Sequence, residues 1–222
     1  MEKSQHLSLS AKRIAELSMP TFCPRCFWIT NKLELPYNYF PSVFSRLDLA
    51  AKSVSKTAIH EKMPLRWMDE LPPIRNEIRV SSAKRFFVID PRTGLRVTGV
   101  PDALFELEDR TYAIIDYKVS NVNESARSDN PIYRAQLSIY AFIAETLGYR
   151  PVSHLGLLYY EPLLVNGEVG MPKKYLKRHS FMLPFQAHYF PIAPDSNIHS
   201  YFERAYCEDC RKLRELIAAV TG

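Results

Sequence analysis

The stretch Gly99–Lys118, GVPDALFELEDRTYAIIDYK, contains two segments rich in apolar residues, separated by the polar tetrapeptide EDRT. This pattern is typical of a β-hairpin. Asp102 lies near the start of the first segment. The second segment ends in Asp116, Tyr117 and Lys118. Because side chains alternate along a strand, we expect Asp116 and Lys118 to point to one face of the sheet and Tyr117 to the other.

The two carboxylates of this hairpin indicate a cation site. The hairpin can bring Asp102 beside Asp116, and adjacent carboxylates repel each other unless a cation lies between them. A Mg²⁺ ion bound by one or two carboxylates and by substrate phosphate oxygens would remove this repulsion. Lys118 would then orient or stabilise an attacking hydroxide, or neutralise charge on the phosphate. The alternative interpretation is an ordinary salt bridge on an edge strand.

A helix is predicted from Pro131 to about Leu147, because proline is well suited to the first turn of a helix. Gln136 and Tyr140 are four residues apart and therefore lie on one face of this helix. Placed against the hairpin, these side chains can hydrogen-bond phosphate oxygens or stack on a base. The alternative is that the helix packs its tyrosines into the core.

These motifs together resemble those of the PD-(D/E)XK nuclease superfamily. Pro101-Asp102 and Asp116-Tyr117-Lys118 are similar to the motif from which the superfamily takes its name. Gln136–Tyr140, QLSIY, resembles the QxxxY motif of the RecB-like branch. That branch includes the RecB and AddB nuclease domains and the CRISPR adaptation nucleases.

The resemblance implies a role for each of these residues. Asp102, Asp116 and the backbone carbonyl of Tyr117 would hold Mg²⁺ or Mn²⁺, and Lys118 would assist the nucleophile. The glutamine and tyrosine of the QxxxY motif would position the nucleic-acid strand.

The third metal ligand stays open between two residues. RecB-like nucleases often supply a histidine ligand from a helix that precedes the sheet, and the apolar spacing predicts such a helix at residues 42–59. Asp48 lies inside this predicted helix and His60 lies at its end. We take Asp48 as the candidate ligand and keep His60 as the alternative, although either residue can equally be solvated.

The four cysteines form two Cys-x-x-Cys pairs, Cys23 with Cys26 and Cys207 with Cys210. The spacing lets the two thiolates of a pair converge on one ion. If the segments 19–30 and 200–215 meet in the fold, the two pairs form one site with four thiolates. The alternative is two separate thiol pairs without a metal.

Two groups fit such a site. Paired Cys-x-x-Cys spacing favours Zn²⁺. The tripeptide Cys23-Pro24-Arg25 instead resembles the first cysteine motif of the iron–sulfur CRISPR nucleases, which implies a [4Fe–4S] cluster with a structural role. In those relatives one N-terminal cysteine joins three C-terminal ones, whereas this chain divides them two and two. We favour the cluster and keep Zn²⁺ as the alternative.

The composition is that of a globular protein. The chain has 222 residues, of which 46% are hydrophobic and 24% charged, and this length fits one domain with a full core. The net charge of +5 is compatible with a nucleic-acid partner, and equally with an ordinary basic surface. The basic run at residues 173–179, KKYLKRH, is open to the same two interpretations.

The sequence gives no sign of membrane insertion. No apolar run reaches the roughly 18 residues that a membrane span needs. The N-terminal segment MEKSQHLSLSAKRIAEL lacks the apolar core of a signal peptide. We therefore expect a cytoplasmic protein.

The expected fold class is α/β, with a mixed central β-sheet flanked by helices in a single domain that spans residues 1–222. Its core would run from about 42 to 190, and the cysteine site would join the terminal segments. We predict helices at 11–18, 42–59, 131–147 and 195–220, and strands at 77–80, 84–89, 95–107, 112–118, 151–160 and 181–190.

The resemblance implies a metal-dependent DNA nuclease. Its partner would be DNA, with single strands slightly favoured and RNA still open, together with proteins of repair, recombination or CRISPR-type complexes. A function of another class is a non-catalytic module that binds nucleic acid or supports assembly, in which the hairpin is only a scaffold.

Overall fold

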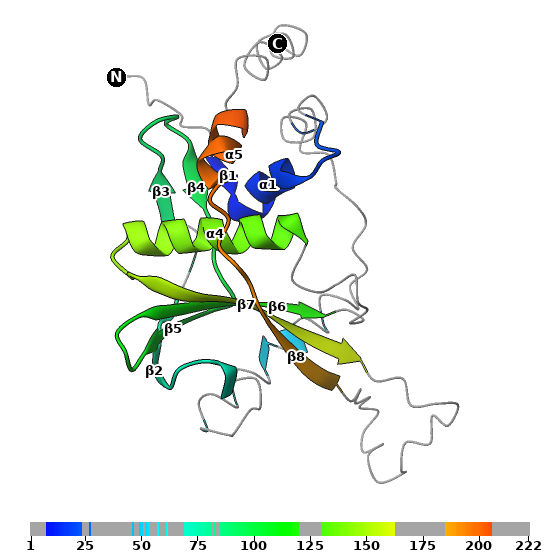
Figure 1. Cartoon of the computed structure of the whole chain (residues 1–222), viewed down its shortest axis with the longest axis vertical. Helices are drawn as coiled ribbons and strands as arrows, with labels where there is room; N and C mark the ends of the chain where they lie inside the picture. Colours follow the sequence, from blue (N-terminus) through cyan, green and yellow to red (C-terminus); the bar gives the residue numbers. More distant parts are fainter. Residues whose placement is uncertain are drawn as a thin grey trace, which may run out of the picture.

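The computed structural model describes residues 8–23, 69–80, 82, 85–119, 130–162 and 185–205, together with the single positions 27, 46, 49, 50, 52, 53, 57 and 61. Within these ranges the chain forms two β-sheets and several helices (Figure 1). The architecture is mixed α/β, as the sequence predicts.

The larger sheet has five strands in the order β2-β5-β6-β7-β8. The strands are β2 (Ile74–Glu77), β5 (Ala103–Leu107), β6 (Tyr112–Val119), β7 (Val152–Pro162) and β8 (Phe185–Pro191). Strands β6 and β7 run parallel, and the other neighbours are antiparallel. Parallel neighbours need a crossover connection, which α4 (Pro131–Thr146) provides.

A second layer covers the outer side of α4. It contains a three-stranded sheet in the order β1-β4-β3 and three short helical segments. These elements are β1 (Ser8–Ser10), β3 (Phe87–Ile89), β4 (Arg96–Thr98), α1 (Ala11–Ala15), the 3₁₀ turn η1 (Glu16–Ser18) and α5 (Ile198–Ala205). Helix α4 therefore lies between the five-stranded sheet and this layer (Figure 1).

Alternation along the strands divides the apolar side chains between two cores. Leu104 and Ile114 belong to the core shared with α4. Phe105 and Ile115, their neighbours along β5 and β6, belong to the core on the opposite face of the sheet. By the same alternation Asp116 lies on the α4 face, two residues beyond Ile114.

Helix α4 begins where the sequence predicts. The side-chain oxygen of Asn130 accepts a hydrogen bond of 3.0 Å from the backbone N–H of Ile132, and Pro131 occupies the first turn. Asparagine as the N-cap followed by proline is a strong signal for a helix start. The predicted helix at 131–147 is confirmed to within one residue.

The first predicted helix divides into α1 and η1, and Ser10 caps its start. The hydroxyl of Ser10 accepts a hydrogen bond of 3.3 Å from the backbone N–H of Arg13. The described positions of the predicted helix at 42–59 are helical, but Asp48 and His60 lie outside the described residues.

The prediction of one continuous strand at residues 95–107 was wrong. The chain forms β4 in the small sheet, leaves it at Gly99, and begins β5 in the large sheet at Ala103. Pro101 has no N–H to donate to a ladder, and Gly99 packs directly against α4. A β-carbon on Gly99 would lie 2.5 Å from Cε1 of Tyr140. The apolar pattern continues through the break because both strands contribute to buried cores.

Candidate active site

The hairpin brings Asp102, the residue directly before β5, next to Asp116 on β6. Ala103, directly after Asp102, pairs with Ile115, directly before Asp116. The Oδ2 atom of Asp102 accepts a hydrogen bond of 2.8 Å from the backbone N–H of Tyr117. Asp116 is 5% exposed and Asp102 is partly buried. The predicted juxtaposition of the two carboxylates is therefore present.

Each carboxylate has a lysine beside it. The ammonium of Lys118 forms an ion pair with Oδ2 of Asp116. The ammonium of Lys52 lies 3.0 Å from Oδ1 of Asp102. Two negative and two positive side chains thus meet at this end of the hairpin, and these four formal charges sum to zero.

The pKa of Asp116 shows how strongly this environment affects a carboxylate. Burial raises its pKa to about 6, the nearby Lys118 ammonium opposes this increase, and the Asp102 carboxylate adds to it. A buried carboxylate beside a second one favours an added positive charge. The site therefore suits a cation.

The α4 face supplies two polar side chains next to the carboxylates. Nε2 of Gln136 donates a hydrogen bond of 2.8 Å to the hydroxyl of Tyr140, and both residues are buried. Burial and the negative charge of Asp116 raise the pKa of Tyr140, so its hydroxyl stays protonated. The structure places Gln136 and Tyr140 next to the hairpin that carries Asp102 and Asp116, where the sequence predicts them.

Removing the Tyr140 hydroxyl tests this buried hydrogen bond. We expect Tyr140→Phe to lower the free energy of unfolding by about 1 kcal/mol, because the Gln136 amide loses its acceptor. Urea denaturation measures the change. The double variant with Gln136→Leu removes both partners and should recover most of the loss. Equal stability of Tyr140→Phe and the parent would show that the bond contributes nothing.

Lys118 also contacts α4. Its ammonium lies 4.8 Å from the centroid of the Tyr133 ring, which is within range of a cation–π interaction. Lys118 and Tyr117 are consecutive on β6, and Tyr117 belongs to the core on the opposite face. The expected division of these side chains between the two faces is confirmed.

A cleft of about 770 Å³ opens beside Asp102. Its walls come from the ends of β2 and β5 and from helical positions that include Lys52 and Thr57. Charged side chains of both signs line it, among them Glu61, Glu77 and Arg79. One of the two carboxylates is therefore accessible from the surface.

The donor set fits a hard divalent cation. Both carboxylates offer oxygen ligands, which Mg²⁺ and Mn²⁺ prefer. Within the described ranges, no group of three or more histidine, cysteine or acidic side chains is close enough to hold a metal. The third ligand predicted from the helix before the sheet, Asp48 or His60, lies outside those ranges.

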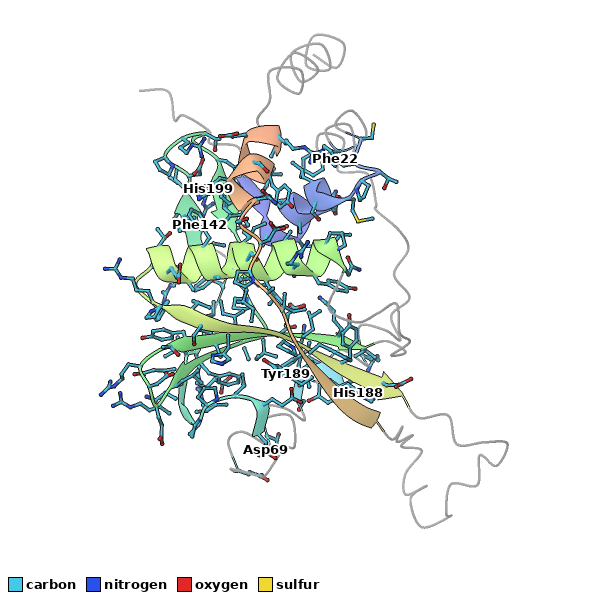
Figure 2. All side chains as sticks on the ribbon, viewed as in Figure 1. Phe22, Asp69, Phe142, His188, Tyr189 and His199 are labelled. Atoms are coloured by element: carbon cyan, nitrogen blue, oxygen red, sulfur yellow. The ribbon has the colours of Figure 1, made fainter. Side chains whose placement is uncertain are left out.

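Of the four cysteines, the structure describes only Cys23, which is exposed; Cys26, Cys207 and Cys210 lie outside the described residues. The neighbouring residues nevertheless bring the two cysteine-bearing segments together. The Phe22 ring lies 5.5 Å from the Phe27 ring, centroid to centroid, and 5.1 Å from the guanidinium carbon of Arg204 in α5. Figure 2 shows Phe22 in the layer that also contains α5.

Lys52 is the residue at this site that the sequence analysis missed. It lies on a predicted amphipathic helix, where a lysine is usually a solvated residue. Nothing in the helical spacing distinguishes it from other lysines, because its partner is 50 residues away in sequence. Only the tertiary structure reveals the contact.

The fold and the site now define a class: a mixed α/β protein with two adjacent carboxylates and a lysine at the end of a central hairpin. Residues 21–219 match the family model described as the PD-(D/E)XK nuclease superfamily. The chain belongs to this superfamily, and this membership supports nuclease activity as its class of function.

The comparison with solved structures finds similar chains at low sequence identity. A phage-related exonuclease from Haemophilus somnus 129PT has a TM-score of 0.50 and 9% identity, over 98% of this chain and 97% of that chain. The crystal structure of SSO0001 has a TM-score of 0.45 and 17% identity, over 93% of this chain and 76% of that chain. The comparison with curated proteins finds no match. Among the described helices, none is long and apolar enough to cross a membrane.

Proposed function

We propose that this protein is a metal-dependent DNA nuclease of the RecB-like branch that hydrolyses phosphodiester bonds. The observation that carries the proposal is the pairing of Asp102 with Asp116, beside Lys118, on the hairpin of a chain that belongs to a nuclease superfamily. Asp116 is buried, and the neighbouring Asp102 carboxylate adds to the increase of its pKa, an environment that favours a further positive charge.

The residues have the following roles in this proposal. Asp102, Asp116 and the backbone carbonyl of Tyr117 would hold Mg²⁺ or Mn²⁺, with Asp48 as the further ligand and His60 as the alternative. When bound, such an ion would supply water activation and stabilisation of the charge that develops on the phosphate. Lys118 is already in contact with Asp116. Its ammonium orients the attacking hydroxide and neutralises phosphate charge.

Gln136 and Tyr140 of the QxxxY motif position the nucleic-acid strand and support the site that contains the two carboxylates. Gln136 and Tyr140 are buried between α4 and the sheet, and Tyr140 is close enough to Asp116 and Asp102 for their charges to raise its pKa. From this position the two side chains form part of the wall of the site beside the carboxylates. DNA would enter through the cleft beside Asp102, and single strands would be slightly preferred. Proteins of repair, recombination or CRISPR-type complexes would be the partners, as the RecB-like branch suggests.

We also propose that Cys23, Cys26, Cys207 and Cys210 form one structural [4Fe–4S] site, with Zn²⁺ as the alternative. The contact of Phe22 with Arg204 supports it, because it brings residues next to Cys23 close to the helix that precedes Cys207 in sequence. Arg204 also donates a hydrogen bond of 2.8 Å to the backbone carbonyl of Leu17. Two interactions thus hold α5 against the N-terminal segment.

Substitution of one cysteine tests this site. We expect anaerobically purified protein to contain iron and to absorb in the visible range, and Cys23→Ser to lose both signals and to melt at least about 5 °C lower, since a structural metal site contributes directly to folding. Elemental analysis distinguishes iron from zinc. The control is Ser18→Ala, a change outside the cysteine pairs on the same segment. Unchanged metal content in Cys23→Ser would exclude Cys23 as a ligand.

Cleavage of end-labelled DNA tests the main proposal. Loss of Mn²⁺-dependent cleavage in Asp116→Asn, with the fold retained, is the result that we expect. Retained cleavage would exclude Asp116 as a metal ligand of the reaction.

A further inference from the structure

Lys52 lies beside one of the two carboxylate oxygens of Asp102. The Oδ1 atom of Asp102 lies 3.0 Å from the Lys52 ammonium, whereas Oδ2 accepts the hydrogen bond from the Tyr117 N–H. Both oxygens of Asp102 therefore have a partner within the protein. Of these partners, the Tyr117 N–H is fixed by β6, and the Lys52 ammonium is at the end of a flexible side chain.

The two lysines differ in what they can do when a cation arrives. Lys118 belongs to the hairpin, and its ammonium also lies over the Tyr133 ring, 4.8 Å from the ring centroid. Lys52 comes from a different segment, and its side chain is 31% exposed along the cleft. A lysine side chain has a flexible four-carbon stem and a strongly hydrated ammonium. Lys52 can therefore move away from Asp102 without disturbing β5 or β6.

We propose that Lys52 is an exchangeable counter-ion: it neutralises Asp102 in the metal-free protein, and a divalent cation must displace it before Asp102 can serve as a ligand. This inference rests on the proposed metal-dependent function. An ammonium and a dication at the same carboxylate oxygen repel each other, so the ion pair with Lys52 competes with metal binding by Asp102.

The cleft gives the displaced ammonium a new partner. Lys52 and Asp102 line the same space of about 770 Å³, so a substrate phosphate bound next to Asp102 would also be within reach of Lys52. Ammonium groups bind phosphate oxygens through charge-assisted hydrogen bonds. Occupation of the metal site therefore releases a positive charge for the nucleic-acid backbone, and by reciprocity the nucleic acid promotes metal binding.

Calorimetric titration of Mn²⁺ into the metal-free protein tests the proposal without any measurement of activity. We expect Lys52→Gln to bind Mn²⁺ roughly tenfold more tightly than the parent, because a competing positive charge next to the ligand is gone. Lys52→Arg keeps the charge and should bind within about twofold of the parent. Arg79→Gln removes another positive charge that lines the same cleft, and serves as the matched control for a general electrostatic effect.

The substitution Asp102→Asn completes the design. The gain from Lys52→Gln should disappear when Asp102→Asn is also present, since the ion pair no longer exists. Unchanged or weaker Mn²⁺ binding in Lys52→Gln, in a protein whose parent binds Mn²⁺ through Asp102, would overturn the role of Lys52 and leave the proposed function standing. Absence of Asp102-dependent Mn²⁺ binding in the parent would overturn the proposed function itself. Lys52→Met provides the same test if glutamine impairs folding.

Discussion

Asp116→Asn is expected to reduce metal-dependent DNA cleavage by more than about a thousandfold, which is the range for loss of a central electrostatic group in an active site. The carboxylate is buried, faces Lys118 and lies next to Asp102. An amide in its place is nearly isosteric, but it removes the negative charge that would bind the cation. Rates of cleavage of end-labelled DNA, measured with saturating Mn²⁺, give the size of the effect.

The stability of this variant separates chemistry from folding. An aspartate whose pKa is raised in the folded state lowers stability once the pH exceeds its unfolded value, because the folded protein then favours the protonated form. Burial raises the pKa of Asp116 to about 6, so at neutral pH its ionised form opposes folding. Asp116→Asn should therefore melt no more than about 3 °C below the parent.

Glu106→Gln is the matched control. Glu106 lies on β5 in the same hairpin, and its carboxylate pairs with Arg75 at 3.0 Å and with Arg110 at 3.3 Å. Like Asp116→Asn, the substitution Glu106→Gln exchanges a carboxylate for an amide. Glu106 is partly buried and lies at the opposite end of the hairpin from Asp102. Cleavage by this variant should match that of the parent. Equal losses in both variants would assign the effect to the fold rather than to the site.

Gly99→Ala is expected to destabilise the protein by about 3 kcal/mol, the upper range for an added methyl group in a packed core. The added carbon would lie 2.5 Å from Cε1 and 2.9 Å from Cδ1 of Tyr140, and 3.1 Å from the β-carbon of Ala11. The φ angle of Gly99 is not positive, so the effect is steric. Because Tyr140 must move and it bonds Gln136, cleavage should fall as well.

A double-mutant cycle isolates this contact. Tyr140→Ala removes the ring that Gly99→Ala would strike, so the second substitution should have a much smaller effect in the Tyr140→Ala background. Urea denaturation of the four proteins provides the free energies of unfolding. An equal effect of Gly99→Ala in both backgrounds would show that the Tyr140 ring is not the cause.

The predictable part of this protein is local in sequence. The hairpin follows from two apolar segments around a polar break, and α4 follows from Asn130 and Pro131 with a helical pattern behind them. The adjacent placement of Asp102 and Asp116 then follows from the hairpin alone, since Ala103 pairs with Ile115. The hairpin and α4 depend on residues a few positions apart or on a single turn. Patterns at this short range can be recognised in one sequence.

The parts that sequence reasoning missed depend on distant segments. The division of residues 95–107 between two sheets goes together with the packing of Gly99 against Tyr140, a contact across 41 positions. Residues on both sides of the break are buried, so the apolar pattern shows no interruption. Lys52 reaches Asp102 through the tertiary arrangement alone. Such contacts leave no periodic signal in one sequence.

The most direct measurement is cleavage of end-labelled single- and double-stranded DNA by the parent protein, purified anaerobically to protect the proposed cysteine site. One reaction contains Mn²⁺ and a parallel one contains a chelator. We predict cleavage with Mn²⁺ and none with the chelator, because Asp102 and Asp116 need a bound cation to act on a phosphodiester. Absence of cleavage with Mn²⁺, or equal cleavage in the chelator, would contradict a metal-dependent nuclease.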